Sequence, residues 1–424
     1  SFIESLVTLV NCRPDGTLKA KDIVDYWKRP EYIYLGPDEN MHDFMIQWIA
    51  DYSKRYNYFP GSSFISSKPL VGINHKEFGV TSLGVNVYME AVLKYFGIDP
   101  KKDPFTIKMS GGPDGDVAGN QIRNLYLHYP KTAKLLALTD ASGTMYDPNG
   151  IDLSVLHDLF LNGKPLKFYP PELLRPKGFL LDRYTKKQVT PLIQHTLCWR
   201  NIDGKLEKDW ISGSDMNYLF RHNVLKTKAD IFIPAGGRPR TLSSSNVKDF
   251  LDETGKPTAR AIIEGANLYL TDSAREFLDK LCVLIIKDSS ANKTGVICSS
   301  YEVLCGLALG DEKFMEHKIV IVEQILDRLR LSAQREADLL LRTKHDTGEE
   351  MSKISDKIYS RIDQFSTQIL EFLEPATLSH NLNDPLIKSF IQYCLPILQN
   401  YITKELLENI PEHHKKAIIA THIA

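Results

Sequence analysis

Apolar residues recur in three different patterns along the chain. Up to about residue 75 they return every three or four positions, which is the period of an amphipathic helix with one buried face. That face consists of Met41, Phe44, Met45, Trp48, Ile49 and Tyr52. Gly36-Pro37-Asp38 stands directly before it, and a turn that ends in an acidic N-cap predicts the start of a helix.

Between about residues 76 and 300, short apolar runs alternate with helical segments. The runs lack polar alternation, so we expect buried strands of a parallel sheet with helices on both faces. They occupy residues 105–109, 135–139, 231–234, 261–263 and 283–287. Residues 163–215 are rich in proline, lysine and aromatic side chains and are interpreted as a long insertion or loop. The predicted fold class is therefore α/β, with a Rossmann-like doubly wound parallel sheet.

From about residue 300 to the end the pattern is helical. One apolar face carries Val322, Ile325, Leu326 and Leu329, and residues 334–374 are charged and helix-prone. This charge indicates a solvated helical surface, with a subunit contact as the alternative. The changes of pattern predict three regions, residues 1–75, 76–298 and 299–424.

Composition narrows the class of protein. The 424 residues carry a net charge of −1, which argues against nucleic acid and anionic membranes as partners. No apolar run approaches the roughly 18 residues of a membrane span. The six cysteines are scattered without a CxxC pair and no histidine pair has metal-ligand spacing, so we expect a reducing intracellular compartment and no metal. His413 and His414 are expected in an exposed tail.

A glycine-rich turn, residues 110–119, separates the strand at 105–109 from a helix that begins near residue 121, and Asp140 ends the next strand. This order is typical of dinucleotide binding, because glycines let the backbone approach a pyrophosphate and the helix N-terminus favours anions. The motif is irregular. Pro113 and Ala118 stand where a strict G-x-G-x-x-G has glycine, so an ordinary β–α turn remains the alternative.

Further segments around this turn together resemble the amino-acid dehydrogenases, most closely the large NAD-specific glutamate dehydrogenases. The resemblance covers about residues 30–305. It is carried by Pro37-Asp38 before Trp48-Ile-Ala-Asp51, Phe78-Gly-Val-Thr-Ser-Leu-Gly84, Leu138-Thr-Asp-Ala-Ser-Gly143, Asp230-Ile-Phe-Ile-Pro-Ala235, Glu264-Gly-Ala-Asn267, and Asn292-Lys-Thr-Gly-Val296 with Ser299. The resemblance makes 1–75 the end of a substrate domain, 76–298 the NAD-binding domain and 299–424 a helical C-terminal region.

The resemblance also implies roles for single residues. Asp38 would be the catalytic carboxylate that moves protons to and from the substrate amino group, unless it merely caps a helix. Ser299 would contact the distal part of the substrate. Asn267 would approach both substrate and nicotinamide. The cofactor contacts would come from Thr81, whose alternative is a helix cap, and from Gly112, Gly115, Asp116, Val117, Asp140, Ala235, Asn267 and Asn292. A carboxylate at Asp140 would accept ribose hydroxyls and repel a 2′-phosphate, which favours NAD over NADP.

The implied reaction is oxidative deamination of L-glutamate to 2-oxoglutarate and ammonia, with hydride transfer to NAD. The family supplies its substrate-binding lysines from a Gly-Gly-x-Lys-Gly-Gly segment, and Lys19, Lys21 and Lys28 lack such glycines. We therefore expect the C-terminal part of a longer enzyme, incomplete as a catalyst alone, with an inactive relative as the alternative.

Two other functions remain open at this point. One is a branched-chain or aromatic amino-acid dehydrogenase, and the other is a non-catalytic NAD-binding module. The family resemblance implies a homo-oligomer for the full-length protein. A cytoplasmic location is expected, with the mitochondrial matrix as the alternative.

Overall fold

The computed structural model describes residues 3, 33–37, 41–55 and 58–424. The chain divides into two compact units. Unit 1 comprises Ser1–Phe78, Gly295–Leu329 and Ile358–Ala424, and unit 2 comprises Gly79–Thr294 and Arg330–Lys357. Two long helices, α11 (Thr294–Thr347) and α12 (Met351–Leu373), contribute residues to both units. The functional division at residues 75 and 298 remains a prediction.

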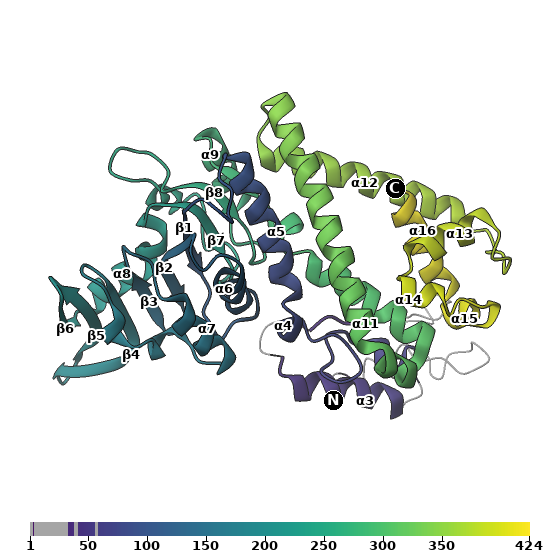
Figure 1. The fold of residues 1–424 in the computed structure, drawn as a ribbon, viewed down its shortest axis with the longest axis horizontal. Helices are drawn as coiled ribbons and strands as arrows, with labels where there is room; N and C mark the ends of the chain where they lie inside the picture. The colour runs from purple at the N-terminus through teal and green to yellow at the C-terminus, as the bar shows by residue number, and fades with distance from the viewer. Residues whose placement is uncertain (1–2, 4–32, 38–40, 56–57) are drawn as a thin grey trace. The chain divides into compact units, whose positions relative to one another are not determined.

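Unit 2 is built on one nine-stranded sheet with the order β6-β5-β4-β3-β2-β1-β7-β8-β9 (Figure 1). Its parallel part is formed by β1 (Phe105–Ser110), β2 (Ala133–Asp140), β7 (Ala229–Pro234), β8 (Ala259–Ile263) and β9 (Leu284–Ile286). These are the five strands predicted from the apolar runs, so the prediction of an α/β fold with a parallel sheet is confirmed.

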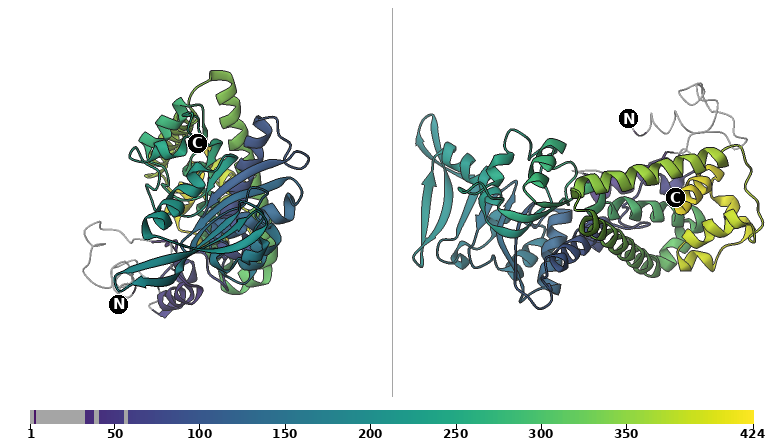
Figure 2. Two further views of the ribbon diagram at one scale, coloured as in Figure 1. Left: turned by 90° about the vertical axis from the view of Figure 1, so that its left-hand side faces the viewer. Right: turned by 90° about the horizontal axis from the view of Figure 1, so that it is seen from above.

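Four antiparallel strands extend the sheet beyond β2 (Figure 2). They are β3 (Gly143–Tyr146), β4 (Phe179–Thr190), β5 (Ile193–Ile202) and β6 (Lys205–Ile211). The interpretation of residues 163–215 as a loop is therefore wrong for most of that segment. One small cluster of buried side chains holds the extension: Phe179, Leu181, Cys198 and Ile211. The outer half of β4 is exposed and charged, which hides its strand character in the sequence.

Helices cover both faces of the sheet. On one face, α8 (Gly213–Lys226) and α9 (Asp272–Lys280) share a core cluster with Phe232, Ile262 and Ile285 of the parallel strands. On the other face lie α5 (Val80–Tyr95), α6 (Asp116–His128) and α7 (Leu153–Leu161) (Figure 1). Neighbouring strand residues point to opposite faces, so both faces need cover and the sheet is doubly wound.

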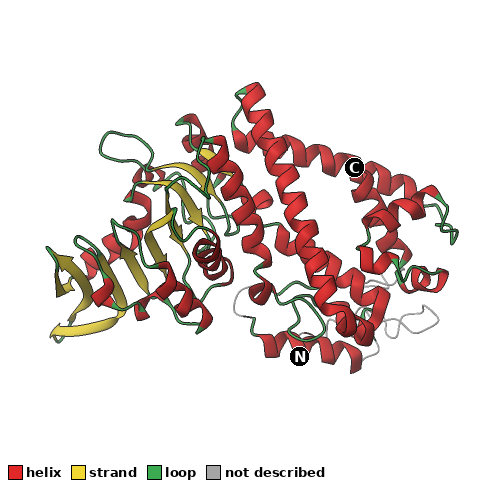
Figure 3. Cartoon of the chain, viewed as in Figure 1, coloured by secondary structure: helices red, strands yellow, loops and turns green. Residues whose placement is uncertain are grey.

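Unit 1 is built from helices (Figure 3). Besides its parts of α11 and α12 it contains η1 (Gly61–Phe64), α3 (Asp43–Arg55), α4 (His75–Phe78), α13 (Pro385–Tyr393), α14 (Pro396–Gln399), α15 (Lys404–Asn409) and α16 (Glu412–Ile423). In the described residues, no helix is both long and apolar enough to cross a membrane.

Two expectations for unit 1 need correction. The helix predicted around residues 41–52 exists as α3, but its buried side is formed by Ile46, Ile49 and Ala50. Phe44 and Trp48 of the predicted face are exposed. The segment has two apolar stripes, and the helical period alone does not tell which one packs against Tyr58 and Phe64. His414 is partly buried, with its ring centre 5.5 Å from that of Tyr34, so it is not part of an exposed tail.

One buried lysine in unit 2 has no partner of opposite charge among the described residues. Lys108 of β1 is fully buried, and its Nζ donates to the Leu225 carbonyl (3.1 Å) and to Thr258 Oγ1 (2.6 Å). The Nζ also lies 4.2 Å from the centre of the Phe250 ring, and the described residues place no carboxylate within ion-pair distance of it. Burial lowers the pKa of Lys108 well below its ordinary value, because the charged form loses its hydration.

We expect Lys108→Met to stabilise unit 2 by about 1–2 kcal/mol at pH 7, since methionine fills similar space without a charge to desolvate. In the wild type, the unfolded chain binds the lysine proton more tightly than the folded chain does. Unfolding free energy therefore rises with pH toward 10.5. Urea unfolding at pH 7, 8, 9 and 10 measures both effects, with Lys134→Met, at an exposed position of β2, as the control. A rise between pH 8 and 10 as steep in Lys108→Met as in the wild type would contradict this account.

Candidate functional site

The carboxyl ends of β1 and β7 touch where the order of the strands reverses. The chain leaves β1 toward β2 on one side and returns as β7 on the other. Ser110 Oγ donates to the Gly236 carbonyl (2.7 Å), and a Cβ added to Gly236 would lie 2.8 Å from Gly111 Cα. A crevice at such a reversal point is where open α/β sheets bind their ligands.

The glycine-rich turn connects β1 to α6. Gly111 adopts φ 101°, a left-handed conformation that favours glycine, and a Cβ there would lie 2.7 Å from the Cβ of Ala118. Gly115 is the N-cap of α6, and Asp116 and Val117 form its first turn. The backbone freedom lies at Gly111 and Gly112, before Pro113, so the proline is accommodated. The missing Cβ atoms let Gly111 pack against Ala118 and Gly236, and Gly112 against Asp140.

Asp140 ends β2 directly beside this turn. A Cβ added to Gly112 would lie 2.4 Å from Asp140 Oδ2. The carboxylate is buried and accepts four hydrogen bonds from its own chain: Oδ1 from Ser142 N (2.7 Å), Ser142 Oγ (2.6 Å) and Gly143 N (3.0 Å), and Oδ2 from Leu166 N (2.7 Å). Burial raises its pKa, and the bond from Ser142 opposes that rise. Asp140 therefore lies beside the glycine-rich turn, as predicted, while its contact with a ribose remains a prediction.

Asn267 and Asn292 meet although 25 residues separate them. Asn292 Nδ2 donates to Asn267 Oδ1 and lies 3.5 Å from the Gly265 carbonyl. Gly265 faces the first turn of α6, because a Cβ there would come within 3.2 Å of Val117 Cγ1. The residues predicted to contact the cofactor after β8 (Asn267), after β9 (Asn292) and at the start of α6 (Val117) thus lie at one edge of the sheet.

Thr81 and Ala235 lie at the same edge. Thr81 is in the first turn of α5, whose N-cap is Gly79 with φ 64°, so the helix cap considered for Thr81 is instead a glycine. Thr294 Oγ1 donates to the Thr81 carbonyl (3.3 Å), which joins α5 to the segment that carries Asn292. The amide of Ala235 donates to the Ser110 carbonyl (2.8 Å) and holds the end of β7 against β1.

A buried ion-pair network supports the loop that carries Asn267. The Arg275 guanidinium binds the Glu264 carboxylate through Nε (2.7 Å) and Nη2 (2.9 Å), and both side chains are buried. Arg275 Nη2 also reaches Asp288 Oδ1 (3.4 Å), while Asp288 Oδ2 accepts from the Leu268 amide (2.7 Å). Burial raises the pKa of Glu264, and Arg275 opposes the rise. Sequence motifs did not indicate Arg275 or Asp288, since the bonds cross 11 to 20 residues.

Ser299, for which a substrate contact was predicted, lies in unit 1 beside other polar groups. Its Oγ accepts from Ser66 Oγ (3.0 Å) and lies 3.4 Å from His75 Nε2. Burial lowers the pKa of His75 to about 4, so the ring is neutral near pH 7. Asp38 lies outside the described residues. Leu35, three positions before it, pairs with the Ile65 backbone beside Ser66.

A buried ion pair anchors this cluster. Lys68 Nζ donates to Glu302 Oε1 (2.6 Å), and Glu302 Oε2 accepts from the amides of Ser67 and Ile73 (3.0 Å each). Glu302 follows Ser299 by three residues on α11, so one turn of helix fixes both to the loop that contains Ser66. Ser66, Lys68, His75 and Glu302 were not predicted as site residues, because neither spacing nor motif reveals which of them share a cluster.

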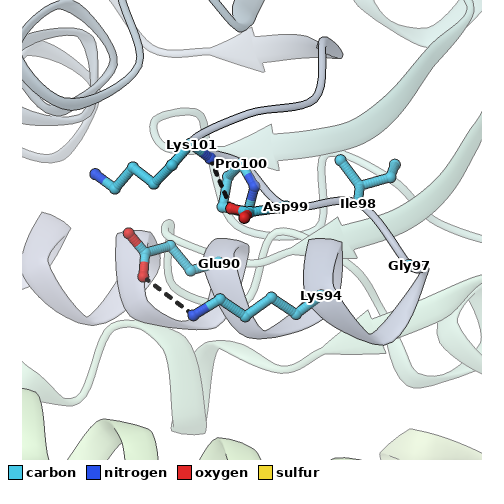
Figure 4. A pocket seen from close by; sticks show the side chains of 7 residues that line it. All are labelled: Glu90, Lys94, Gly97, Ile98, Asp99, Pro100 and Lys101. Carbon is cyan, nitrogen blue, oxygen red and sulfur yellow. Dashed lines mark hydrogen bonds and ion pairs between the residues drawn. The ribbon is translucent and has the colours of Figure 1, made fainter.

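One open cavity of about 530 Å³ lies elsewhere in unit 2 (Figure 4). It is lined by Glu90, Lys94, Gly97, Ile98, Asp99, Pro100 and Lys101. These residues end α5 and precede β1, so the cavity lies at the amino end of that strand and away from the glycine turn. In the described part of the chain, no group of three His, Cys, Asp or Glu side chains is arranged to hold a metal ion.

Comparison with known proteins adds independent evidence. A family model described as Glutamate/Leucine/Phenylalanine/Valine dehydrogenase matches residues 72–349. The probable NAD-specific glutamate dehydrogenase of Schizosaccharomyces pombe is 30% identical over 439 residues, which cover 100% of this chain and 36% of that protein. Glutamate dehydrogenase 2 of Dictyostelium discoideum is 29% identical, with 97% and 38% covered. The chain therefore spans less than two fifths of the length of these two relatives.

A solved structure supports the fold. The hetero-hexameric glutamate dehydrogenase from Thermus thermophilus superposes with a TM-score of 0.52 at 18% identity, covering 83% of this chain and 64% of that one. At this identity the likeness concerns the fold alone.

Protonation of His75 should weaken unit 1. The folded-state pKa of about 4 lies below the 6.5 of the unfolded chain, so the unfolded state binds the proton more tightly. Unfolding free energy should fall as the pH drops from about 6.5 to about 4, by up to about 3 kcal/mol. Urea unfolding across this range should give a flatter profile for His75→Gln, whereas His345→Gln, at a largely exposed position, should match the wild type. Equal pH slopes in all three proteins would contradict the prediction.

Proposed function

The chain belongs to the Glutamate/Leucine/Phenylalanine/Valine dehydrogenase family, and we propose on this premise that it supplies the NAD-binding part of a glutamate dehydrogenase. The reaction is oxidative deamination of L-glutamate to 2-oxoglutarate and ammonia. The observation that carries the proposal is the glycine-only meeting of Gly111, Gly112 and Gly236 at the carboxyl ends of β1 and β7. The whole of this chain also matches part of a probable NAD-specific glutamate dehydrogenase. Because the chain is a minor part of such relatives, the activity is proposed for the complete protein.

The residues at the crevice fit a dinucleotide. Gly111 and Gly112 let the turn lie close against Gly236 and Asp140 beside the N-terminus of α6, which favours the negative charge of a diphosphate. Asp140 is proposed to lie at the adenosine ribose, and Thr81, Asn267 and Asn292 at the nicotinamide end. When bound, NAD accepts the hydride from the substrate Cα.

The cluster around Ser299 supports glutamate as the substrate. Two serine hydroxyls and a neutral imidazole, next to the buried Lys68–Glu302 ion pair, offer hydrogen bonds that suit a polar side chain better than a branched or aromatic one. Asp38 is proposed to move protons at the substrate nitrogen. The cation that binds the substrate carboxylate is expected from the rest of the complete protein.

Two finer proposals concern the complete protein. We propose that it is a homo-oligomer, as membership of this dehydrogenase family implies. We also propose a cytoplasmic or mitochondrial-matrix location, in keeping with free cysteines in the described residues.

The direct test is NADH formation by the complete protein with glutamate, leucine, valine and phenylalanine. Glutamate is expected to give the highest kcat/KM. Asp38→Asn should lower kcat at least about 100-fold with little change in NAD affinity, because the loss concerns proton transfer alone. Turnover with none of the four amino acids, in a protein that still binds NAD, would indicate a non-catalytic module.

Gly112→Ala tests the cofactor crevice. The added Cβ would lie 2.4 Å from Asp140 Oδ2 and 2.7 Å from Asp114 Oδ1, and the Asp140 carboxylate is held in place by four hydrogen bonds. The dissociation constant for NAD should rise at least about tenfold, which corresponds to about 1.4 kcal/mol. Gly213→Ala is the matched control, since no atom lies within 4 Å of its added Cβ. An unchanged NAD titration for Gly112→Ala would place the cofactor elsewhere.

A further inference from the structure

The loop after β7 carries two exposed arginines at the edge of the crevice. Arg238 and Arg240 follow Gly236, whose backbone contacts Gly111 of the glycine turn. Within the part of the chain that the structure describes, neither guanidinium has a hydrogen bond or an ion pair with the protein. The two cations therefore remain available to a ligand.

The loop holds these arginines on a clamped backbone. The Arg240 amide donates to the Leu268 carbonyl (2.7 Å), and the Leu242 amide donates to the Tyr269 carbonyl (3.0 Å). Thr241 Oγ1 donates to the Arg238 carbonyl (2.5 Å). A Cβ on Gly237 would lie 2.7 Å from the ring of Tyr269, so the loop packs closely on the segment after β8. A clamped loop presents its side chains with little loss of entropy on binding.

The backbone of this contact is strained on both sides. Arg240 has φ 61° and Leu268 has φ 53°, a left-handed conformation that costs residues other than glycine on the order of 1–2 kcal/mol each. Asparagine or glycine would adopt it at lower cost, and no described residue binds the Arg240 guanidinium. A strained backbone that carries an exposed arginine is compatible with a ligand contact at this position.

The charged residues near the glycine turn indicate which group of a ligand the two arginines would bind. Asp114 and Asp116 place two carboxylates at the glycine turn, where the diphosphate of a dinucleotide would lie. Lys287 and Lys293, which flank the segment with Asn292, are engaged in ion pairs with Asp356 and Glu336. A diphosphate at this edge needs positive charge, and the planar guanidinium suits phosphate oxygens in pairs.

We propose that Arg238 and Arg240 bind the diphosphate of the dinucleotide from the β7 side of the crevice, opposite the glycine turn. The inference rests on the proposed NAD site and adds two positively charged residues to it. In this arrangement the glycines admit the diphosphate, and the two arginines offset its charge and that of the neighbouring aspartates.

The test uses the complete protein with Arg238→Gln, Arg240→Gln and the double variant. Glutamine at position 240 has the same left-handed backbone strain as arginine. The difference in binding between the wild type and the variant therefore reports the loss of the positive charge. Arg221→Gln, at an exposed arginine of α8, is the matched control. Titrations with NAD, ADP-ribose and adenosine separate the diphosphate from the rest of the ligand, because adenosine lacks phosphate.

Each single variant should weaken NAD and ADP-ribose binding at least about tenfold and leave adenosine binding unchanged. Added salt should weaken the wild type more than the double variant, since it screens charge. The Arg221→Gln control should match the wild type.

Three results would overturn the proposal. One is a double variant that binds NAD within twofold of the wild type. Another is an equal loss for adenosine, which would mean that the loop has collapsed. The third is a raised KM for glutamate with unchanged NAD affinity, which would assign the arginines to the substrate. If the wild type binds neither NAD nor ADP-ribose, the proposed function itself fails, a result distinct from these three.

Discussion

The candidate site depends on one steric constraint: the ends of β1 and β7 approach so closely that no side chain fits between them. Gly111 and Gly236 supply that approach, and the bond from Ser110 Oγ to the Gly236 carbonyl fixes it. Because parallel strands end at one edge, the constraint also determines what surrounds it. The turn into α6 follows β1, the arginine loop follows β7, and the Asn267 loop follows the neighbouring strand β8.

The parallel half of the sheet was predictable because its strands are buried on both faces and stand out as apolar runs. The antiparallel half was not, since β4 is apolar only from Phe179 to Leu181 and then charged. A local signal did exist. Asp203-Gly204, with φ 50° and 89°, joins β5 to β6, and an Asp-Gly pair between strands favours a two-residue hairpin turn. In α3, by contrast, two apolar stripes compete and only tertiary packing decides between them.

The site residues likewise divide into those that motifs predicted and those that only the folded structure reveals. The motifs predicted that Gly112, Asp140 and Asn267 lie near one edge of the sheet, and each does lie at the end of a strand or a few residues beyond it. Their roles as ligand contacts stay predictions, and the hydrogen bonds that occupy the Asp140 carboxylate could not be foreseen from a strand-end aspartate. Partners such as Arg275 for Glu264 and His75 for Ser299 lie 11 and 224 residues away, and only the folded chain brings them together.

The β4–β6 extension grows from the edge of the sheet beyond β3, several strands away from β1 and β7. New strands there add surface without moving the strand ends that form the crevice. The extension can therefore change in length and charge without displacing the ends of β1 and β7. The Asp203-Gly204 turn at its outer end is accordingly a natural insertion point for a fluorescent reporter or an affinity tag.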